Sequence, residues 1–152
     1  MNLFPTKIKA VAWEAEPQCT VLPGEDDDRL KLTADWCFTV AGERSVIAVR
    51  PARGFRFEGS VPRLFWRILT PTDPAAWAAF CIHDFAYLLC KRGYCTREQA
   101  DEMLFLALRR NGFSYLTAWG VYCSVRAFGG AYAAKPLTQS EIAELKAAGY
   151  PA

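Results

Sequence analysis

The sequence predicts an α+β fold in a single domain, in which a small antiparallel β-meander precedes a helical part. Between residues 20 and 57, short apolar–polar alternations are separated by turn residues, which is typical of half-buried strands. After Pro74, apolar residues recur every three or four positions, as on one face of a helix. Because 152 residues with 52% hydrophobic side chains can form one core, we expect a single unit. Its parts would be the β-rich residues 1–70, the helical residues 71–130 and the tail 131–152.

Three alternating runs form the predicted meander. They are Leu30–Thr33, Trp36–Val40 and Val46–Val49. Turn-forming residues bound these runs, namely Pro23-Gly24, Ala41-Gly42 and Pro51. Alternation over such short, bounded runs indicates antiparallel strands.

The first two predicted helices form a hairpin. The first runs from about Pro74 to Leu89 and the second from Arg97 to Arg110. Thr96 is followed three residues later by Gln99, which is the pattern of a capping box at a helix start. The loop between the helices is short enough to fold them antiparallel.

Two more helices are predicted towards the C-terminus. The third runs from Ser114 to Phe128 and is apolar on nearly all sides, which favours a buried core helix. Its apolar stretch is shorter than the ~18 residues that a membrane span needs, so we expect no transmembrane segment. A short amphipathic helix follows from Ser140 to Gly149.

The six cysteines are expected to be mostly buried, free thiols. The first nine residues contain no apolar run followed by a cleavage site, which argues against secretion into an oxidising compartment. One alternative stays open, because Cys90 and Cys95 flank a short loop that a disulfide could close. The absence of CxxC and HxxxH pairs argues against a zinc site.

Positive charge gathers between residues 44 and 67. Six arginines lie there with a single acid, Glu58, although the net charge of the chain is only +2. Such a segment favours anionic partners such as lipid headgroups or acidic protein surfaces. The segment does not show the single-residue interleaving of aromatic and basic residues that is typical of RNA-binding modules, which argues against nucleic acid. Alternatively, the arginines are solvated or paired with the acids at 25–28.

The candidate chemical site lies on the predicted hairpin. His83, the only histidine, lies on the apolar face of the first helix, with Tyr87 one turn later. Asp101 lies in the apolar stripe of the second helix, where an unpaired carboxylate would be costly to bury. We therefore expect His83 and Asp101 to be hydrogen-bonded across the hairpin. The second imidazole nitrogen would then be free to act as a general base towards water.

Asp84 and Arg126 leave two interpretations of this site open. On a helix Asp84 points about 100° away from His83, where it could hold a hard cation such as calcium. That cation would stabilise an oxyanion beside the activated water. Alternatively, His83 is a core histidine satisfied by Asp101, and Asp84 pairs with Arg126, the only charge on the third helix. The site is then structural.

Residues 80–87, with the sequence FCIHDFAY, together with Ala100-Asp101 and Phe105 resemble the active-site helices of phospholipase A2, particularly its short bacterial and parvoviral forms. The resemblance implies that His83 is the general base and Asp84 a calcium ligand. It implies that Tyr87 and Asp101 hold the histidine. At the place of that family's glycine-rich calcium loop, Phe57–Pro62 contains one glycine, and the paired cysteines of the helix are absent.

A second resemblance covers about residues 46–134. The pattern is similar to an uncharacterised family of short proteins from tailed phages and prophages, which implies a phage origin without a mechanism. The residues that carry it are Arg53-Gly54-Phe55, residues 59–66 (GSVPRLFW), His83-Asp84-x-x-Tyr87, Arg97-x-x-Ala100-Asp101 and Val125-Arg126-x-Phe128-Gly129. That family usually has an aspartate where this chain has Glu58, which makes Glu58 either a further cation ligand or the partner of Arg126.

Three functions of different classes follow. The first is a phage-encoded acyl-ester hydrolase acting on lipid, with His83, Asp101 and Tyr87 in the catalytic site and Asp84 and Glu58 holding calcium. The second is a non-enzymatic virion or tail component that keeps the same scaffold. The third is a small effector that binds a host protein through the arginine-rich segment. The expected partners are therefore phage virion or tail proteins or anionic lipid, and the expected location is the host cytoplasm or the virion.

Overall fold

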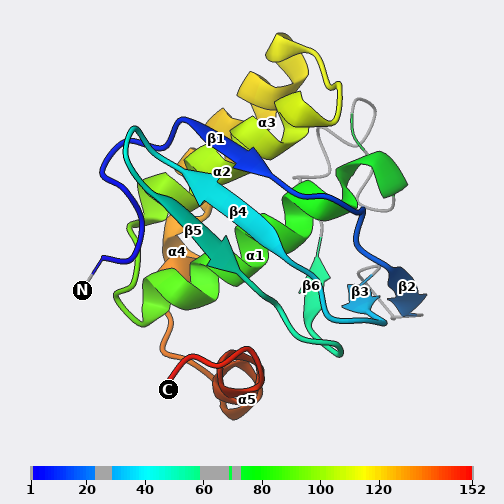
Figure 1. Ribbon diagram of the computed structural model, residues 1–152, viewed down its shortest axis with the longest axis vertical. Helices are drawn as coiled ribbons and strands as arrows, with labels where there is room; N and C mark the ends of the chain where they lie inside the picture. The colour runs from blue at the N-terminus through cyan, green and yellow to red at the C-terminus, as the bar shows by residue number, and fades with distance from the viewer. Residues whose placement is uncertain (1, 23–28, 59–68, 70–72, 152) are drawn as a thin grey trace.

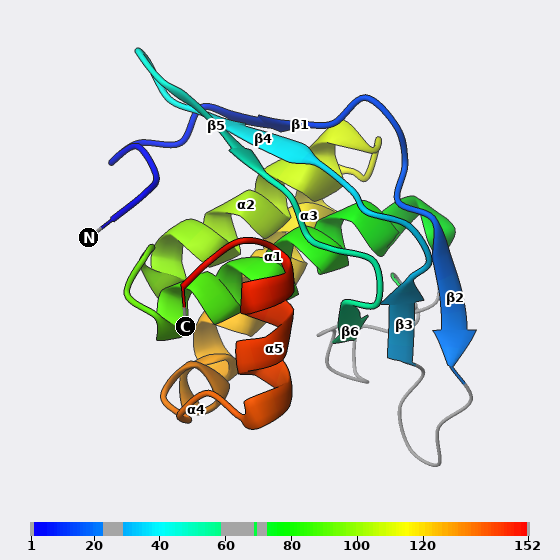
Figure 2. The ribbon, with the colours of Figure 1, turned by 60° about the horizontal axis from the view of Figure 1, so that its bottom comes forward.

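The computed structural model describes residues 2–22, 29–58, 69 and 73–151. Within these ranges the fold is α+β, as predicted, with two three-stranded antiparallel sheets and five α-helices (Figure 1). The helices α1 and α2 form a central layer. The first sheet covers one side of this layer, and α3 and α4 lie on the other side (Figures 1 and 2).

The first sheet has the strand order β1-β4-β5, with β1 (Ala10–Ala12), β4 (Phe38–Ala41) and β5 (Val46–Val49). Its central strand buries Phe38 and Val40, while the alternate residues Thr39 and Ala41 stay partly exposed. This alternation places one face of the sheet on the helical layer and leaves the other in solvent.

The second sheet has the order β2-β3-β6, with β2 (Cys19–Leu22), β3 (Arg29–Leu32) and β6 (Arg56–Glu58). Phe57 pairs with Leu30, and both side chains are fully buried. The strand β6 also lies against α1, which brings Glu58 to the middle of that helix (Figure 2).

The prediction of a single meander was wrong. The runs at 30–33 and 36–40 lie in different sheets, and β1 completes the first sheet without having been predicted. Alternation indicates which face of a strand is buried, but it does not indicate the partner strand. A strand of three residues is too short to show a period.

The helical hairpin forms as predicted. A 3₁₀ turn, η2 (Pro74–Ala76), leads into α1 (Trp77–Lys91), and α2 (Arg97–Arg110) follows. Thr96 and Gln99 form the predicted capping box at the start of α2. The helix α1 is buried along most of its length because the other layers surround it.

Three helices follow the hairpin: α3 (Tyr115–Phe128), α4 (Gly130–Ala133) and α5 (Gln139–Ala147). The prediction that the third helix is buried was wrong, because only one of its faces packs against α2. Its outer face leaves large apolar side chains in solvent. The last helix begins at Gln139, one residue before the predicted start, and Thr138 and Glu141 form a capping box at this end. None of the helices in the described ranges is both long and apolar enough to cross a membrane.

All six cysteines are free thiols in this structure. The alternative of a Cys90–Cys95 disulfide is therefore not realised here. Cys95 instead donates its thiol hydrogen to the carbonyl of Ala86, at 3.3 Å.

Candidate functional site

His83 and Asp101 meet across the helical hairpin. The Nε2 atom of His83, on α1, lies 2.8 Å from Oδ1 of Asp101, on α2. Both side chains are buried, with exposed fractions of 1% and 0%. The hydrogen bond expected from the two polar positions on apolar helix faces is therefore present.

Two further groups donate hydrogen bonds to the carboxylate of Asp101. The hydroxyl of Tyr87 reaches Oδ1 at 2.6 Å, and Nη1 of Arg126 reaches Oδ2 at 3.0 Å. Burial alone would raise the pKa of Asp101, but the hydrogen bonds from His83, Tyr87 and Arg126 lower it below its ordinary value. Asp101 is therefore a charged carboxylate that holds groups from α1 and α3 in fixed positions.

The partner of Arg126 differs from the one predicted. The sequence suggested Asp84 or Glu58, but within the described part of the chain the guanidinium binds Asp101. The reason is that α3 packs on α2, so its last turn lies above the first turns of α2. Arg97, which sequence analysis named in a motif but gave no role, fixes this arrangement by donating to the carbonyls of Val125 and Arg126. The i, i+4 spacing of Arg97 and Asp101 was the available signal.

The second ring nitrogen of His83 is in a different environment. Among the described residues Nδ1 has no hydrogen-bond partner, although it is buried. The nearest carboxylate oxygen, Oδ1 of Asp84, lies 3.7 Å away. Burial lowers the pKa of His83, but its hydrogen bond to Asp101 and the negative charges of Asp101 and Asp84 outweigh this effect and raise it overall. The ring is thus held with Nε2 on Asp101 and Nδ1 beside Asp84.

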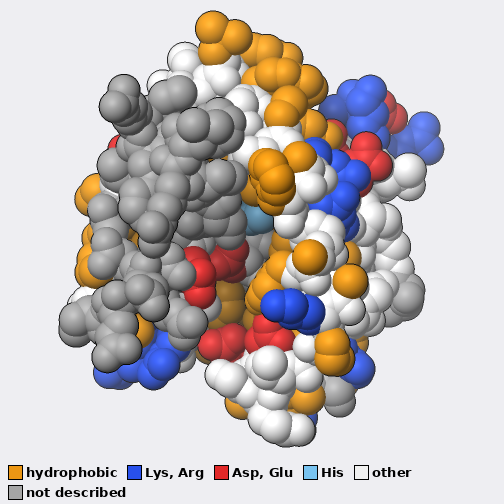
Figure 3. Space-filling view, turned by 180° about the vertical axis from the view of Figure 1, so that it is seen from behind, with side chains coloured by type: hydrophobic (Ala, Val, Ile, Leu, Met, Phe, Trp, Pro, Cys, Tyr) orange, Lys and Arg blue, Asp and Glu red, His pale blue; other side chains and the backbone are white. Residues whose placement is uncertain are grey.

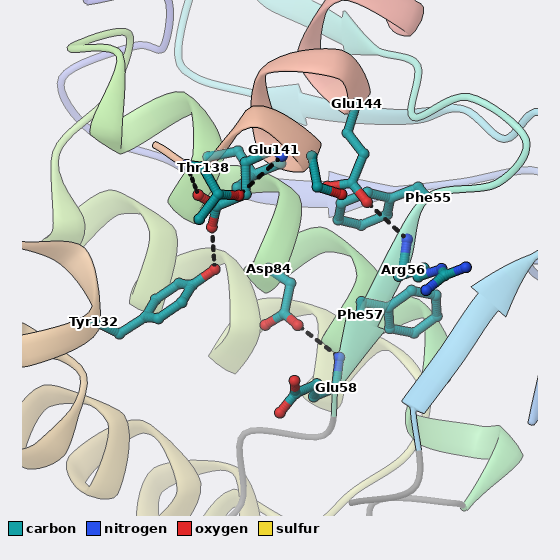
Figure 4. A pocket seen from close by; sticks show the side chains of 11 residues that line it. Phe55, Arg56, Phe57, Glu58, Asp84, Tyr132, Thr138, Glu141 and Glu144 are labelled. Carbon is teal, nitrogen blue, oxygen red and sulfur yellow. Dashed lines mark hydrogen bonds between the residues drawn. The ribbon is translucent and has the colours of Figure 1, made fainter. Parts of the chain in front are cut away.

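Asp84 connects this network to a pocket of about 460 Å³. Its Oδ2 atom accepts a hydrogen bond from the backbone N–H of Glu58, at 2.7 Å. Figure 4 shows the carboxylates of Asp84 and Glu58 on one side of the pocket and those of Glu141 and Glu144, from α5, on the other. Seen from outside, the histidine (pale blue in Figure 3) lies in a hollow directly above acidic side chains.

Sequence analysis did not anticipate the contribution of α5 to this pocket. Glu141 accepts hydrogen bonds from Lys91 at 2.9 Å and from the hydroxyl of Tyr132 at 2.8 Å. Burial raises the pKa of Glu144, and repulsion from Glu141 adds to this, although a hydrogen bond from the backbone N–H of Arg56 lowers it. The sequence separation between α1 and α5 left no local signal for this contact.

The pocket has the donor chemistry that a hard cation prefers, because calcium binds carboxylate and carbonyl oxygens. Asp84 and Glu58, the predicted ligands, bring two carboxylates to the same wall. No group of three or more metal-binding side chains is found within the described ranges. Most of the segment 57–62, which stands at the place of the calcium loop in the phospholipase A2 resemblance, lies outside those ranges.

The close packing of Gly129 against Tyr87 gives a first prediction. A Cβ at Gly129 would lie 2.4 Å from the Tyr87 hydroxyl and 2.6 Å from the carbonyl of Val125. Neither atom can easily move, since the Tyr87 hydroxyl is hydrogen-bonded to Asp101 and the Val125 carbonyl belongs to the backbone of α3. We expect Gly129→Ala to lower the free energy of unfolding by about 1–3 kcal/mol, as measured by urea denaturation.

The matched control is Gly120→Ala, on the same helix. A Cβ there meets nothing within 4 Å. Because alanine favours a helix over glycine, the control should stabilise the protein by roughly 0.5–1 kcal/mol. Equal effects of the two substitutions would show that the Tyr87 contact is not tightly packed.

Comparison with protein families matches residues 30–125 to the model of a protein of unknown function, DUF1353. The matched range begins in β3 and ends in α3. It therefore includes Glu58, Asp84 and the His83–Asp101 pair. No curated protein and no solved structure matches the chain.

Proposed function

The chain belongs to the DUF1353 family, and we propose that it is a phospholipase A2-like hydrolase that cleaves acyl esters of lipids. The orientation of His83 carries this proposal. Its Nε2 atom is hydrogen-bonded to the charged, buried carboxylate of Asp101. Within the described residues its Nδ1 atom makes no hydrogen bond. A general base needs this combination, because one nitrogen must be fixed and the other must keep its lone pair.

In this mechanism the neutral His83 carries its proton on Nε2 and donates it in the hydrogen bond to Asp101. A water molecule that enters past Asp84 gives a proton to Nδ1, and its oxygen attacks the ester carbonyl carbon. The carboxylate of Asp101 stabilises the imidazolium that forms. When the tetrahedral intermediate collapses, Nδ1 returns the proton to the leaving alkoxide, which yields a fatty acid and an alcohol.

Tyr87 and Arg126 act on the base through Asp101. Each donates one hydrogen bond to that carboxylate, one to each oxygen. The two bonds keep Asp101 ionised and set the plane of its carboxylate, and this fixes the tautomer and the direction of the imidazole ring. They are therefore positioning residues.

Asp84 and Glu58 would hold a calcium ion. Bound calcium supplies electrophilic assistance to an ester carbonyl and stabilises negative charge on its oxygen. The fact that supports this assignment is that both carboxylates line the pocket next to His83.

The proposal predicts calcium-dependent hydrolysis. Purified protein should release fatty acid from phospholipid vesicles in millimolar calcium, and EDTA should abolish the release. Calcium should also raise the midpoint of thermal unfolding, since a ligand at 100 times its Kd stabilises the folded state by about 2.7 kcal/mol. Asp84→Asn should lose both effects.

The control for this experiment is Glu144→Gln, which removes a carboxylate from the opposite wall of the same pocket. It should keep most of the thermal shift. A thermal shift that Asp84→Asn retains would place the metal elsewhere. Absence of both hydrolysis and shift in the wild-type protein would contradict the proposal.

A structural role is the second candidate, and one observation favours it. Both oxygens of Asp101 are occupied by protein groups, so the cluster also ties α1, α2 and α3 together. In that case Asp101 variants would lose stability while no substrate is turned over. The phage origin, the virion location and the binding of a host protein stay predictions, and two arginines of the basic segment, Arg63 and Arg67, lie outside the described residues.

A further inference from the structure

The turn between α1 and α2 carries two cysteines that the proposed function does not use. Cys90 lies in the last turn of α1, and Cys95 comes directly before Thr96, the N-cap residue of α2. Cys95 is buried, with 6% of its surface exposed, whereas Cys90 is half-buried. Both are free thiols. The pair therefore combines one thiol that solvent reaches with one that is shielded from it.

The backbone of this turn brings the second cysteine back to the end of α1. The N–H of Gly93 donates to the carbonyl of Cys90 at 2.9 Å, and the N–H of Tyr94 donates to the carbonyl of Leu89 at 2.9 Å. These two bonds form a Schellman motif, which reverses the chain at the end of a helix. Gly93 has a φ of +79°, which glycine adopts without strain. Cys95 follows immediately and so lies against the last turns of α1.

The thiol of Cys95 lies beside that of Cys90. Its Sγ atom is 3.3 Å from the carbonyl oxygen of Ala86. Ala86 is four residues before Cys90, and in an α-helix this carbonyl points towards the N–H of the residue four positions later. The two thiols also interact by a hydrogen bond. Thiols in such contact have the proximity that a disulfide requires.

The surroundings make Cys90 the more reactive of the two thiols. The hydrogen bond from Cys95 and the positive charge of Arg97 outweigh burial and the negative charge of Asp101, so that the pKa of Cys90 falls to about 7. The opposite holds for Cys95, because its hydrogen bond to Cys90, its burial and repulsion from Cys90 raise its pKa far above the ordinary value. At neutral pH Cys90 is partly a thiolate, whereas Cys95 keeps its proton.

We propose that Cys90 and Cys95 form an oxidation site for hydroperoxides, in which Cys90 reacts first and Cys95 then closes a disulfide with it. The site lies at the end of the helical hairpin. It does not depend on the proposed function, because neither thiol takes part in the hydrolysis.

The reaction balances with hydrogen peroxide as the oxidant. The thiolate of Cys90 attacks one peroxide oxygen, so that an S–O bond forms and the O–O bond breaks. The hydroxide that leaves takes up a proton and becomes water, and Cys90 is now a sulfenic acid. The sulfur of Cys95 loses its proton and attacks the sulfur of Cys90. The S–S bond forms, the S–O bond breaks, and the second hydroxide leaves as water with a further proton.

The environment of Cys95 explains the order of the two steps. The charge of the Cys90 thiolate disappears when Cys90 becomes a sulfenic acid, and with it the hydrogen bond and the repulsion that raise the pKa of Cys95. Cys95 therefore becomes a better nucleophile only after the first step. The disulfide would join the end of α1 to the start of α2, and an added dithiol would reduce it again by exchange.

Mass spectrometry after brief exposure to hydrogen peroxide tests the proposal. Trypsin cleaves after Lys91 and Arg92, so Cys90 and Cys95 fall on separate peptides. In the oxidised wild-type protein a disulfide should join these peptides, and dithiothreitol should separate them. The internal control is Cys123, which is exposed on α3. Cys90 should be oxidised roughly threefold faster than Cys123 at neutral pH, and its rate should level off above a pH of about 7.

Two variants of Cys95 separate its two roles. Cys95→Ser keeps a hydroxyl that can donate to Cys90, but it cannot form the disulfide. In this variant Cys90 should react as fast as in the wild-type protein and accumulate as a sulfenic acid, which dimedone traps. Cys95→Ala removes the donor as well, so the oxidation should be slower at neutral pH and should level off at a higher pH.

Three results would overturn the proposal. The first is oxidation of Cys90 in the wild-type protein that is no faster than that of Cys123. The second is a sulfenic acid that persists at Cys90 in the wild-type protein without joined peptides. The third is a Cys95→Ala variant whose rate and pH dependence at Cys90 match those of the wild type. The first two are measured on the wild-type protein, so a variant that folds poorly does not affect them.

Discussion

Asp101→Ala is expected to lower the free energy of unfolding by about 3–5 kcal/mol, the range found when one member of a buried charge cluster is removed. The carboxylate is fully buried and receives hydrogen bonds from His83, Tyr87 and Arg126. Alanine would leave these three donors without their acceptor in the space between α1, α2 and α3. Urea denaturation, monitored by circular dichroism, measures the decrease in the free energy of unfolding.

The neighbouring residue Glu102 provides the control. It lies on the same helix and is partly buried, but it does not belong to the hydrogen-bonded cluster of Asp101. Burial raises the pKa of Glu102, so its ionised form is not favoured by the fold. We expect Glu102→Ala to change stability by less than about 1 kcal/mol. A similarly small effect of Asp101→Ala would show that the cluster contributes little to the fold.

The lowered pKa of Asp101 also predicts how the free energy of unfolding changes with pH in acid. Because the folded-state pKa lies below the unfolded one, the contribution of Asp101 is complete above the unfolded pKa of about 3.9. It is lost as the pH falls through the folded-state pKa. Asp101→Asn cannot titrate, so the difference in stability between this variant and the wild type should shrink in acid.

Local signals explain how much of this site could be predicted from sequence. The capping box at Thr96, the helical period after Pro74 and a polar residue on each apolar face were enough to pair His83 with Asp101. Each of these signals operates within one helix or across one short loop. The same pattern placed Tyr87 one turn from His83, where it reaches the same carboxylate.

Contacts between distant segments could not be predicted in this way. The sequence suggested two acidic partners for Arg126, Asp84 and Glu58, but the packing of α3 on α2 places its guanidinium on Asp101. The apolar composition of α3 indicated burial, but composition does not show whether a second layer covers a helix. The acids of α5 face Asp84 because the chain after α4 folds back over α1, which no local pattern encodes.

The largest expected effect on activity is that of His83→Gln, which should reduce hydrolysis by about 10² to 10⁴-fold, the usual contribution of a general base. Glutamine has a similar length and can still donate a hydrogen bond to Asp101, so folding should be preserved. Thermal unfolding checks this requirement. Hydrolysis of a soluble ester, measured as initial rates, gives the loss.

The pH profile distinguishes a base from a merely structural histidine. Only the neutral form of His83 can accept a proton. Without bound calcium the two aspartates raise its pKa above the ordinary value near 6.5, and calcium on Asp84 would offset part of this rise. The rate should therefore be low in acid, rise as the pH passes through the pKa of His83 and then level off. Tyr87→Phe removes one donor to Asp101 but keeps the ring, so Asp101 becomes a stronger acceptor for His83 and the rise should move to higher pH. If His83 were structural, the rate would show no such rise, and Tyr87→Phe would change stability without moving the profile.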